Sequence, residues 1–143
     1  MTDTWGRRLF KSGGVWLVLT GLVHSLSFLR KPVAANDTER QLLDLMTNYH
    51  FSMLGSVRSM STLMRGFSVA FMLGAFVVGA IALALANEHA GLLKRVALII
   101  TLWLVAMTAV SLNYFFVVPT TFLGIGLLLF LLAWIKFPAE GVS

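Results

Sequence analysis

The stretch from Gly66 to Ala86 carries no charged side chain, and it constrains the fold more than any other feature. An α-helix rises about 1.5 Å per residue, so a stretch of this length crosses the roughly 30 Å hydrocarbon core of a bilayer. Gly66, Ala70 and Gly74 recur every four residues and line one face with small side chains, against which another helix can pack closely. We therefore predict a membrane-spanning helix with the other segments packed around it.

The composition is that of a membrane protein. The 143 residues are 58% hydrophobic and 12% charged, with a mean hydropathy of +0.86, whereas soluble domains are roughly 45–50% apolar and about 25% charged. The absence of cysteine excludes disulfides, thiolate metal sites and cysteine nucleophiles. The basic residues lie beside apolar stretches, so we attribute the net charge of +5 to membrane topology and anionic headgroups. We predict a single integral membrane domain with membrane lipids as partners, no nucleic acid and no cofactor.

Three further apolar segments predict membrane-spanning helices. The first covers about residues 9–29, and no small-residue cleavage site follows it, which argues against a signal peptide. The others cover about residues 96–116 and 120–135, and Pro119 between them is expected to make the chain turn or restart. Together with the span at 66–86, they predict an all-α, polytopic membrane four-helix bundle.

The segment of about residues 37–64, between the first two spans, has a different pattern. Its apolar side chains recur every three or four residues from Leu42 to Met64, and polar side chains fall between them. This periodicity is typical of an amphipathic helix. We predict an additional helix that lies in the headgroup plane or covers the open end of the bundle.

Local signals suggest where this amphipathic helix begins and where the chain bends after it. Asn36 or Asp37 can cap its start, because Glu39 follows Asn36 by three residues as in a capping box. An unbroken helix through the next span would be too long for a bilayer, so we expect a bend at Gly55 or Gly66.

The distribution of basic residues predicts the orientation. Four spans leave both termini on one side, where the basic residues are Arg7, Arg8, Lys11, Lys94, Arg95 and Lys136. The basic residues on the other side are Arg30, Lys31, Arg40, Arg58 and Arg65. Only the first two of these directly follow a span, so the positive-inside rule favours cytoplasmic termini. We predict a multi-pass protein of the plasma membrane, which in a bacterium is the inner membrane.

Two histidines are candidate ligand-binding residues at the outward end. His24 is an ionisable residue within the first span, where such groups often mark a functional pathway; the alternative is a neutral imidazole near the interface. His50 lies in the amphipathic segment and can meet His24 as an acid–base partner, or simply face solvent. A transition metal needs more ligands than these two, so we predict no metal site, and the catalytic residues, if any, are unknown.

Four other residues complete the candidate ligand-binding set. Arg58 and Arg65 are seven residues apart and would share a helix face, where they can hold a phosphate or carboxylate headgroup or reach lipid phosphates without a dedicated ligand. Asn113 and Tyr114 end the polar line of the third span. These residues can line the polar end of a cavity; the alternative is that the Thr and Ser residues of this line bond back to their own helix or to the next one, and that Tyr114 lies at the membrane interface.

Two stretches of the sequence, RSMSTLMRGFSVAFMLGAFVVG and NYFFVVPTTF, are the basis of a family resemblance. With them the chain resembles a group of small uncharacterised bacterial four-helix membrane proteins that is gathered with the DoxX-like families. Part of that grouping is linked to quinone or redox partners, so the resemblance implies such a role without locating a site. The chain departs from it in having no cysteine and no recognisable set of redox ligands.

These observations leave two classes of function open. The first is a non-enzymatic membrane protein that binds a lipid-like or quinone-like molecule, or a membrane partner, at its outward end. In this case the face of Gly66, Ala70 and Gly74 would contact a membrane partner or a second copy. The second is a small membrane enzyme or redox-complex subunit that uses His24 and His50. A transporter or channel is disfavoured, because the spans show no charged pore line.

Overall fold

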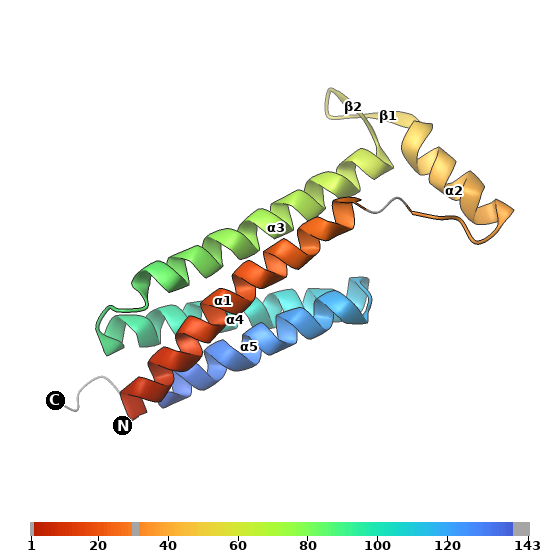
Figure 1. The fold of residues 1–143 in the computed structure, drawn as a ribbon. Helices are drawn as coiled ribbons and strands as arrows, with labels where there is room; N and C mark the ends of the chain where they lie inside the picture. The colour runs from red at the N-terminus through yellow and green to blue at the C-terminus, as the bar shows by residue number, and fades with distance from the viewer. Residues whose placement is uncertain (1, 30–31, 139–143) are drawn as a thin grey trace. The chain divides into compact units, whose positions relative to one another are not determined.

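The computed structural model describes residues 2–29 and 32–138, and this part of the chain forms five α-helices and one two-stranded sheet. In chain order the elements are α1 (Thr2–Ser25), the 3₁₀ helix η1 (Leu26–Leu29), α2 (Asp37–Asn48), β1 (His50–Met53), β2 (Ser56–Ser59), α3 (Met60–Leu85), α4 (Ala90–Tyr114) and α5 (Val117–Lys136) (Figure 1). Four helical segments are long and apolar enough to cross a membrane: Thr4–Leu29, Met60–Leu85, Ala90–Tyr114 and Val117–Lys136. These segments overlap the four predicted spans, although each begins a few residues earlier than predicted, and they indicate a multi-pass membrane protein.

The chain divides into two compact units, and the boundary falls within α1 and within α3. Unit 1 comprises Met1–Thr20 and Ala75–Ser143, and unit 2 comprises Gly21–Gly74. Unit 1 therefore holds most of α1, the second part of α3, and all of α4 and α5. Unit 2 holds α2, the two strands and the first part of α3.

Aromatic rings from α1 and from the end of the chain form part of the core of unit 1. The Phe10 ring packs edge to face against Phe130, with centroids 5.5 Å apart, and against Phe137, with centroids 6.3 Å apart. All three rings are almost completely buried. In the same unit, Trp16 Nε1 donates a hydrogen bond to the Phe122 carbonyl oxygen at 2.8 Å, and the two rings stack. These contacts join α1 to α5.

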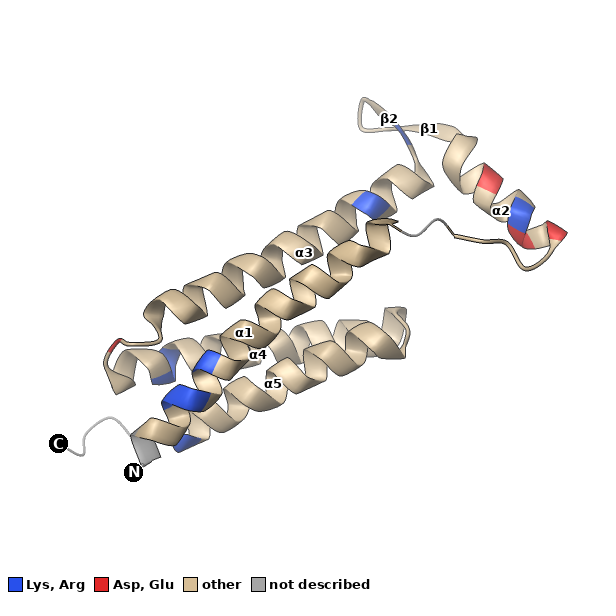
Figure 2. Ribbon diagram, viewed as in Figure 1, with Lys and Arg blue, Asp and Glu red and all other residues tan. Residues whose placement is uncertain are grey.

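The basic residues of unit 1 gather at one end of its helices (Figure 2). Arg7 of α1 donates to the Glu88 carbonyl oxygen at 2.6 Å, and Lys11 donates to the Asn87 side chain at 3.0 Å, so the start of α1 meets the turn between α3 and α4. Lys94 of α4 donates to the carbonyl oxygen of Phe137 at 3.2 Å. The start of α1 and the end of α5 therefore lie at the same end of unit 1.

The small-residue face of α3 is not where α1 and α3 approach most closely. A Cβ added to Gly66 or Gly74 would meet no described atom within 4 Å, and Ala70 is exposed. The close approach occurs farther along, at Gly79, where a Cβ would lie 2.8 Å from the Gly14 carbonyl oxygen. The role of the Gly66, Ala70 and Gly74 face as a contact for a membrane partner or a second copy stays a prediction.

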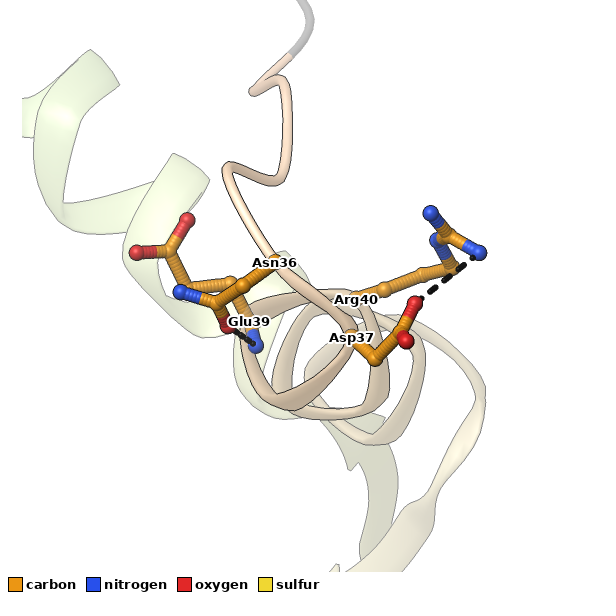
Figure 3. A network of polar contacts seen from close by, with 4 residues as sticks. All are labelled: Asn36, Asp37, Glu39 and Arg40. Atoms are coloured by element: carbon orange, nitrogen blue, oxygen red, sulfur yellow. Dashed lines mark hydrogen bonds and ion pairs between the residues drawn. The ribbon is translucent and has the colours of Figure 1, made fainter.

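The start of α2 in unit 2 is capped as predicted (Figure 3). The side-chain oxygen of Asn36 accepts a hydrogen bond from the Glu39 backbone N–H at 2.9 Å, and the Glu39 carboxylate accepts one from the Ala35 N–H at 2.7 Å. An exposed ion pair at 3.3 Å joins Asp37 to Arg40. Asn36 is confirmed as the N-cap, and the Glu39 side chain bonds back to Ala35, one residue before the N–H that a capping box uses.

The prediction of one amphipathic helix over residues 37–64 is wrong in its extent. The helix ends at Asn48, β1 and β2 pair antiparallel, and α3 begins at Met60. The chain reverses at Leu54 and Gly55, whose φ angles of 48° and 80° are those of a tight hairpin turn. A bend was expected at Gly55 or Gly66, and it occurs at Gly55 as a complete reversal. The fold is thus mostly helical but not purely so, and the interfacial role of α2 stays a prediction.

Candidate functional site

Unit 2 contains a polar pocket where the end of α2, the hairpin and the start of α3 come together. Its volume is about 270 Å³, and its lining residues are Thr47, His50, Ser59, Ser61, Thr62 and Arg65. All six residues are of polar types, and the four from β2 and α3 directly precede the uncharged stretch that begins at Gly66. The sequence singled out two of them, His50 and Arg65, as ligand-binding residues.

The register of the hairpin decides which of its side chains reach the pocket. His50 pairs with Ser59, and Phe51 pairs with Arg58. Side chains alternate between the two faces of a strand, so His50 and Ser59 share one face while Phe51 and Arg58 share the other. The first face is the one that lines the pocket.

Ser59 fixes the start of α3 and thereby the positions of the pocket residues that follow it. It is 3% exposed, its hydroxyl lies 3.0 Å from the Thr62 hydroxyl, and it accepts a hydrogen bond from the Thr62 backbone N–H at 3.3 Å. This bond from residue i+3 is typical of an N-cap serine. Ser61 and Thr62 precede Arg65 by four and three residues, so all three lie on one side of α3.

The His50 ring is held in place by the chain just before it. Its Nδ1 lies 2.9 Å from the Asn48 carbonyl oxygen. A proton on Nδ1 makes this contact a hydrogen bond and leaves Nε2 as an acceptor, whereas a doubly protonated ring can donate from both nitrogens. The imidazole can therefore serve the pocket either as an acceptor or as a cationic donor.

The charge of the pocket favours an anion. Arg65 contributes a guanidinium, and no carboxylate is among the six lining side chains. The positive end of the α3 helix dipole lies beside it, because Ser61 and Thr62 belong to the first turn of that helix. Guanidinium and hydroxyl donors at a helix N-terminus suit phosphate or carboxylate oxygens.

Arg58 does not share a helix face with Arg65, and the expectation that the two would do so is wrong. Arg58 lies in β2, where helical spacing does not apply, and its side chain donates to the carbonyl oxygen of its neighbour Val57 at 2.7 Å. It lies on the hairpin face opposite His50.

His24 and His50 do not line the same pocket. The His24 ring makes edge contacts with Phe71, at a centroid distance of 4.9 Å, and with Phe28, at 6.1 Å. Its Nε2 is buried and has no hydrogen-bond partner among the described residues. Within residues 2–29 and 32–138 no three His, Cys, Asp or Glu side chains gather into a group that can hold a metal ion.

Asn113 and Tyr114 lie at the end of α4, in unit 1. The Asn113 side-chain amide donates to the Ala109 carbonyl oxygen at 2.8 Å, so it bonds back to its own helix. Tyr114 is 80% exposed. The pocket in unit 2 includes neither residue.

Sequence reasoning did not select Thr47 or Ser59 for the pocket, and it did not identify His89 as a helix cap. Ser59 carried a usable signal, because a serine just before a long apolar helix is a strong N-cap candidate. His89 also caps a helix, since its Nδ1 accepts a hydrogen bond from the Leu92 N–H at 3.2 Å. Thr47 carried no such signal, since its place in the pocket depends on how α2 meets the hairpin.

Comparison of this chain with protein-family models, curated proteins and solved structures finds no match.

Proposed function

We propose that this chain is a non-enzymatic protein of the plasma membrane, the inner membrane in a bacterium, that binds the anionic headgroup of a membrane lipid in the pocket of unit 2. The observation that carries the proposal is the lining itself, in which Arg65, His50 and four hydroxyl-bearing residues line a half-open pocket of about 270 Å³ without a carboxylate. Phosphate oxygens accept hydrogen bonds from the guanidinium, from the hydroxyls and from a doubly protonated imidazole.

The position of the pocket along α3 favours a lipid headgroup over a soluble anion. The uncharged part of α3 begins at Gly66, directly after Arg65, and is long enough to cross the hydrocarbon core. Arg65 and the turn before it then lie at the level of the lipid phosphates. The cavity is slightly smaller than the roughly 300–1,000 Å³ typical of whole small-molecule sites, which fits a headgroup with its acyl chains outside.

The same lining argues against the other ligands and activities considered. Small-molecule rings are usually held by aliphatic and aromatic side chains, and the six lining residues include no aliphatic side chain and no aromatic ring other than the His50 imidazole. An enzyme or redox subunit that uses both histidines would need His24 and His50 at one substrate. Only His50 lines the pocket.

The experiment compares two arginine variants in nanodiscs that contain phosphatidylglycerol and phosphatidylcholine. Native mass spectrometry then measures the phosphatidylglycerol that each protein retains. We expect Arg65→Gln to reduce retention about tenfold, because a hydrogen bond to a charged group contributes about 1.5–3 kcal/mol. Arg58→Gln is the matched control, since it removes the same charge from the opposite hairpin face and should reduce retention far less than Arg65→Gln does.

Two outcomes would contradict the proposal. Equal losses in Arg65→Gln and Arg58→Gln would indicate general attraction of lipid phosphates by basic side chains. Release of the lipid by millimolar inorganic phosphate alone would indicate a site for a soluble anion.

The orientation is part of the proposal. We place both termini in the cytoplasm and the pocket at the outer surface. The support is the gathering of Arg7, Lys11 and Lys94 at the end of unit 1 that also holds the start of α1 and the end of α5. Positive residues are enriched on the cytoplasmic side of spans. Arg30 and Lys31, which entered the charge comparison, lie outside the described residues.

A further inference from the structure

The tip of the β1–β2 hairpin exposes a large apolar side chain in a backbone conformation that does not favour it. Leu54 is fully exposed, with a relative exposure of 102%, and its φ is 48°. Two-residue hairpin turns with positive φ at both positions prefer Asn-Gly or Asp-Gly. Leucine does not favour this turn conformation, and at this position its apolar side chain is left exposed outside the protein.

The residues around Leu54 extend this apolar tip. Met53 is 52% exposed and Val57 is 58% exposed. The hairpin sequence from His50 to Ser59 contains no acidic residue and has one arginine, Arg58. An apolar tip with a basic residue close behind it has the character of a segment that enters an anionic bilayer surface.

The covalent connection of the hairpin places it at the membrane. The last residue of β2, Ser59, directly precedes Met60, the first residue of α3, which is apolar and long enough to span a bilayer. In Figure 1 the hairpin extends from the start of α3, and its tip lies away from α2. No linker separates β2 from α3. If α3 spans the bilayer, the hairpin therefore lies close to the bilayer surface.

We propose that the hairpin tip, Met53 to Gly55, inserts into the outer bilayer interface and holds the hairpin against lipid. The occupant of this apolar surface is the bilayer, because the hairpin is continuous with a spanning helix and its only charge is positive. The proposal rests on the exposure of Leu54 and not on the pocket, so the two can fail separately.

The absence of native cysteine makes a site-specific test direct. A nitroxide spin label is attached to Leu54→Cys in vesicles of phosphatidylethanolamine and phosphatidylglycerol, with no other protein present. Its collision rates with oxygen, which concentrates in the bilayer, and with a water-soluble nickel chelate report depth. We expect the Leu54 label to favour oxygen at an interfacial depth of about 5–10 Å.

Two further labels supply the reference values. A label at Gln41→Cys, on the exposed surface of the acidic helix α2, should favour the nickel chelate. A label at Leu73→Cys, within the apolar part of α3, should favour oxygen. A Leu54 label that matches the Gln41 label overturns the proposal and indicates that the tip meets water or a protein partner instead.

A second variant separates insertion from damage to the turn. Leu54→Asn creates the preferred Asn-Gly turn and should leave the hairpin folded, but it removes the apolar side chain. With the label at Val57→Cys, we expect Leu54→Asn to shift the label from oxygen toward nickel accessibility, and Leu54→Phe to leave it unchanged. No shift in Leu54→Asn would contradict insertion by this residue.

Discussion

The Gly14 carbonyl oxygen of α1 lies 2.8 Å from the place where a Cβ on Gly79 of α3 would stand. The Val18 side chain lies 2.9 Å from the same place. The two helices are therefore in backbone contact at this point, and only glycine fits. Such approaches are characteristic of membrane helices, whose association depends on close packing more than on the hydrophobic effect.

Gly79→Ala should destabilise the protein by about 1–3 kcal/mol, because the added methyl group forces two backbones apart. The matched control is Gly74→Ala in the same helix, where a Cβ meets no described atom within 4 Å. Gly74→Ala should stabilise the protein by up to about 1 kcal/mol, because alanine has a higher helix propensity than glycine. Reversible unfolding in mixed detergent micelles measures both, and equal effects would show that the contact at Gly79 does not matter.

Phe10→Ala should lower the free energy of unfolding by about 3–5 kcal/mol, since it leaves a cavity beside the rings of Phe130 and Phe137. Phe67→Ala removes the same atoms from a side chain that is 75% exposed, so it should cost far less. Thermal unfolding in detergent, followed by circular dichroism, compares the two. Similar midpoints for the variants would argue against the buried aromatic cluster.

Ser59→Ala should destabilise the first turn of α3 by about 0.5–2 kcal/mol, because the Thr62 N–H loses its capping partner. Hydrogen exchange of the amides at 60–63 should become faster, while Ser56→Ala, at the exposed end of β2, should not change it. Ser59→Asp retains a cap but adds a negative charge to the pocket. The Ser59→Asp variant should keep the amides of the first turn of α3 protected from hydrogen exchange and still lower phosphatidylglycerol retention. Retention at the level of the unmodified chain would contradict an anion site.

Cytoplasmic termini predict which loops are accessible from outside an intact bacterium. A cysteine at Gln41, on the exposed surface of α2, should react with a membrane-impermeant maleimide added to whole cells. A cysteine at Glu88, in the turn between α3 and α4, should react only after the membrane is permeabilised. The opposite pattern would invert the proposed orientation and place the pocket of unit 2 at the cytoplasmic face.

Local chemistry allowed several features to be read from the residues alone. The uncharged stretch after Gly66 predicted a spanning helix because length and hydropathy suffice for crossing a bilayer. The cap formed by Asn36 and Glu39 was predictable for a similar reason, since its partners lie within four residues of each other. Each of these features needs nothing beyond its own segment of the chain.

The candidate site required information that no single segment contains. Between Tyr49 and Met60 the apolar residues recur every three or four positions, as they would in a helix. The structure has a hairpin there instead, because the two short strands on either side of Leu54 and Gly55 pair with each other.

The sequence by itself determined which segments can enter a membrane and which residues can cap helices, because hydropathy and capping act over a few neighbouring residues. Only the tertiary structure decided that His50 meets Ser59, that Arg58 lies on the opposite strand face, and that α1 touches α3 at Gly79. Strand register and helix contact depend on the shape of a distant partner segment, and that shape exists only once both segments have folded.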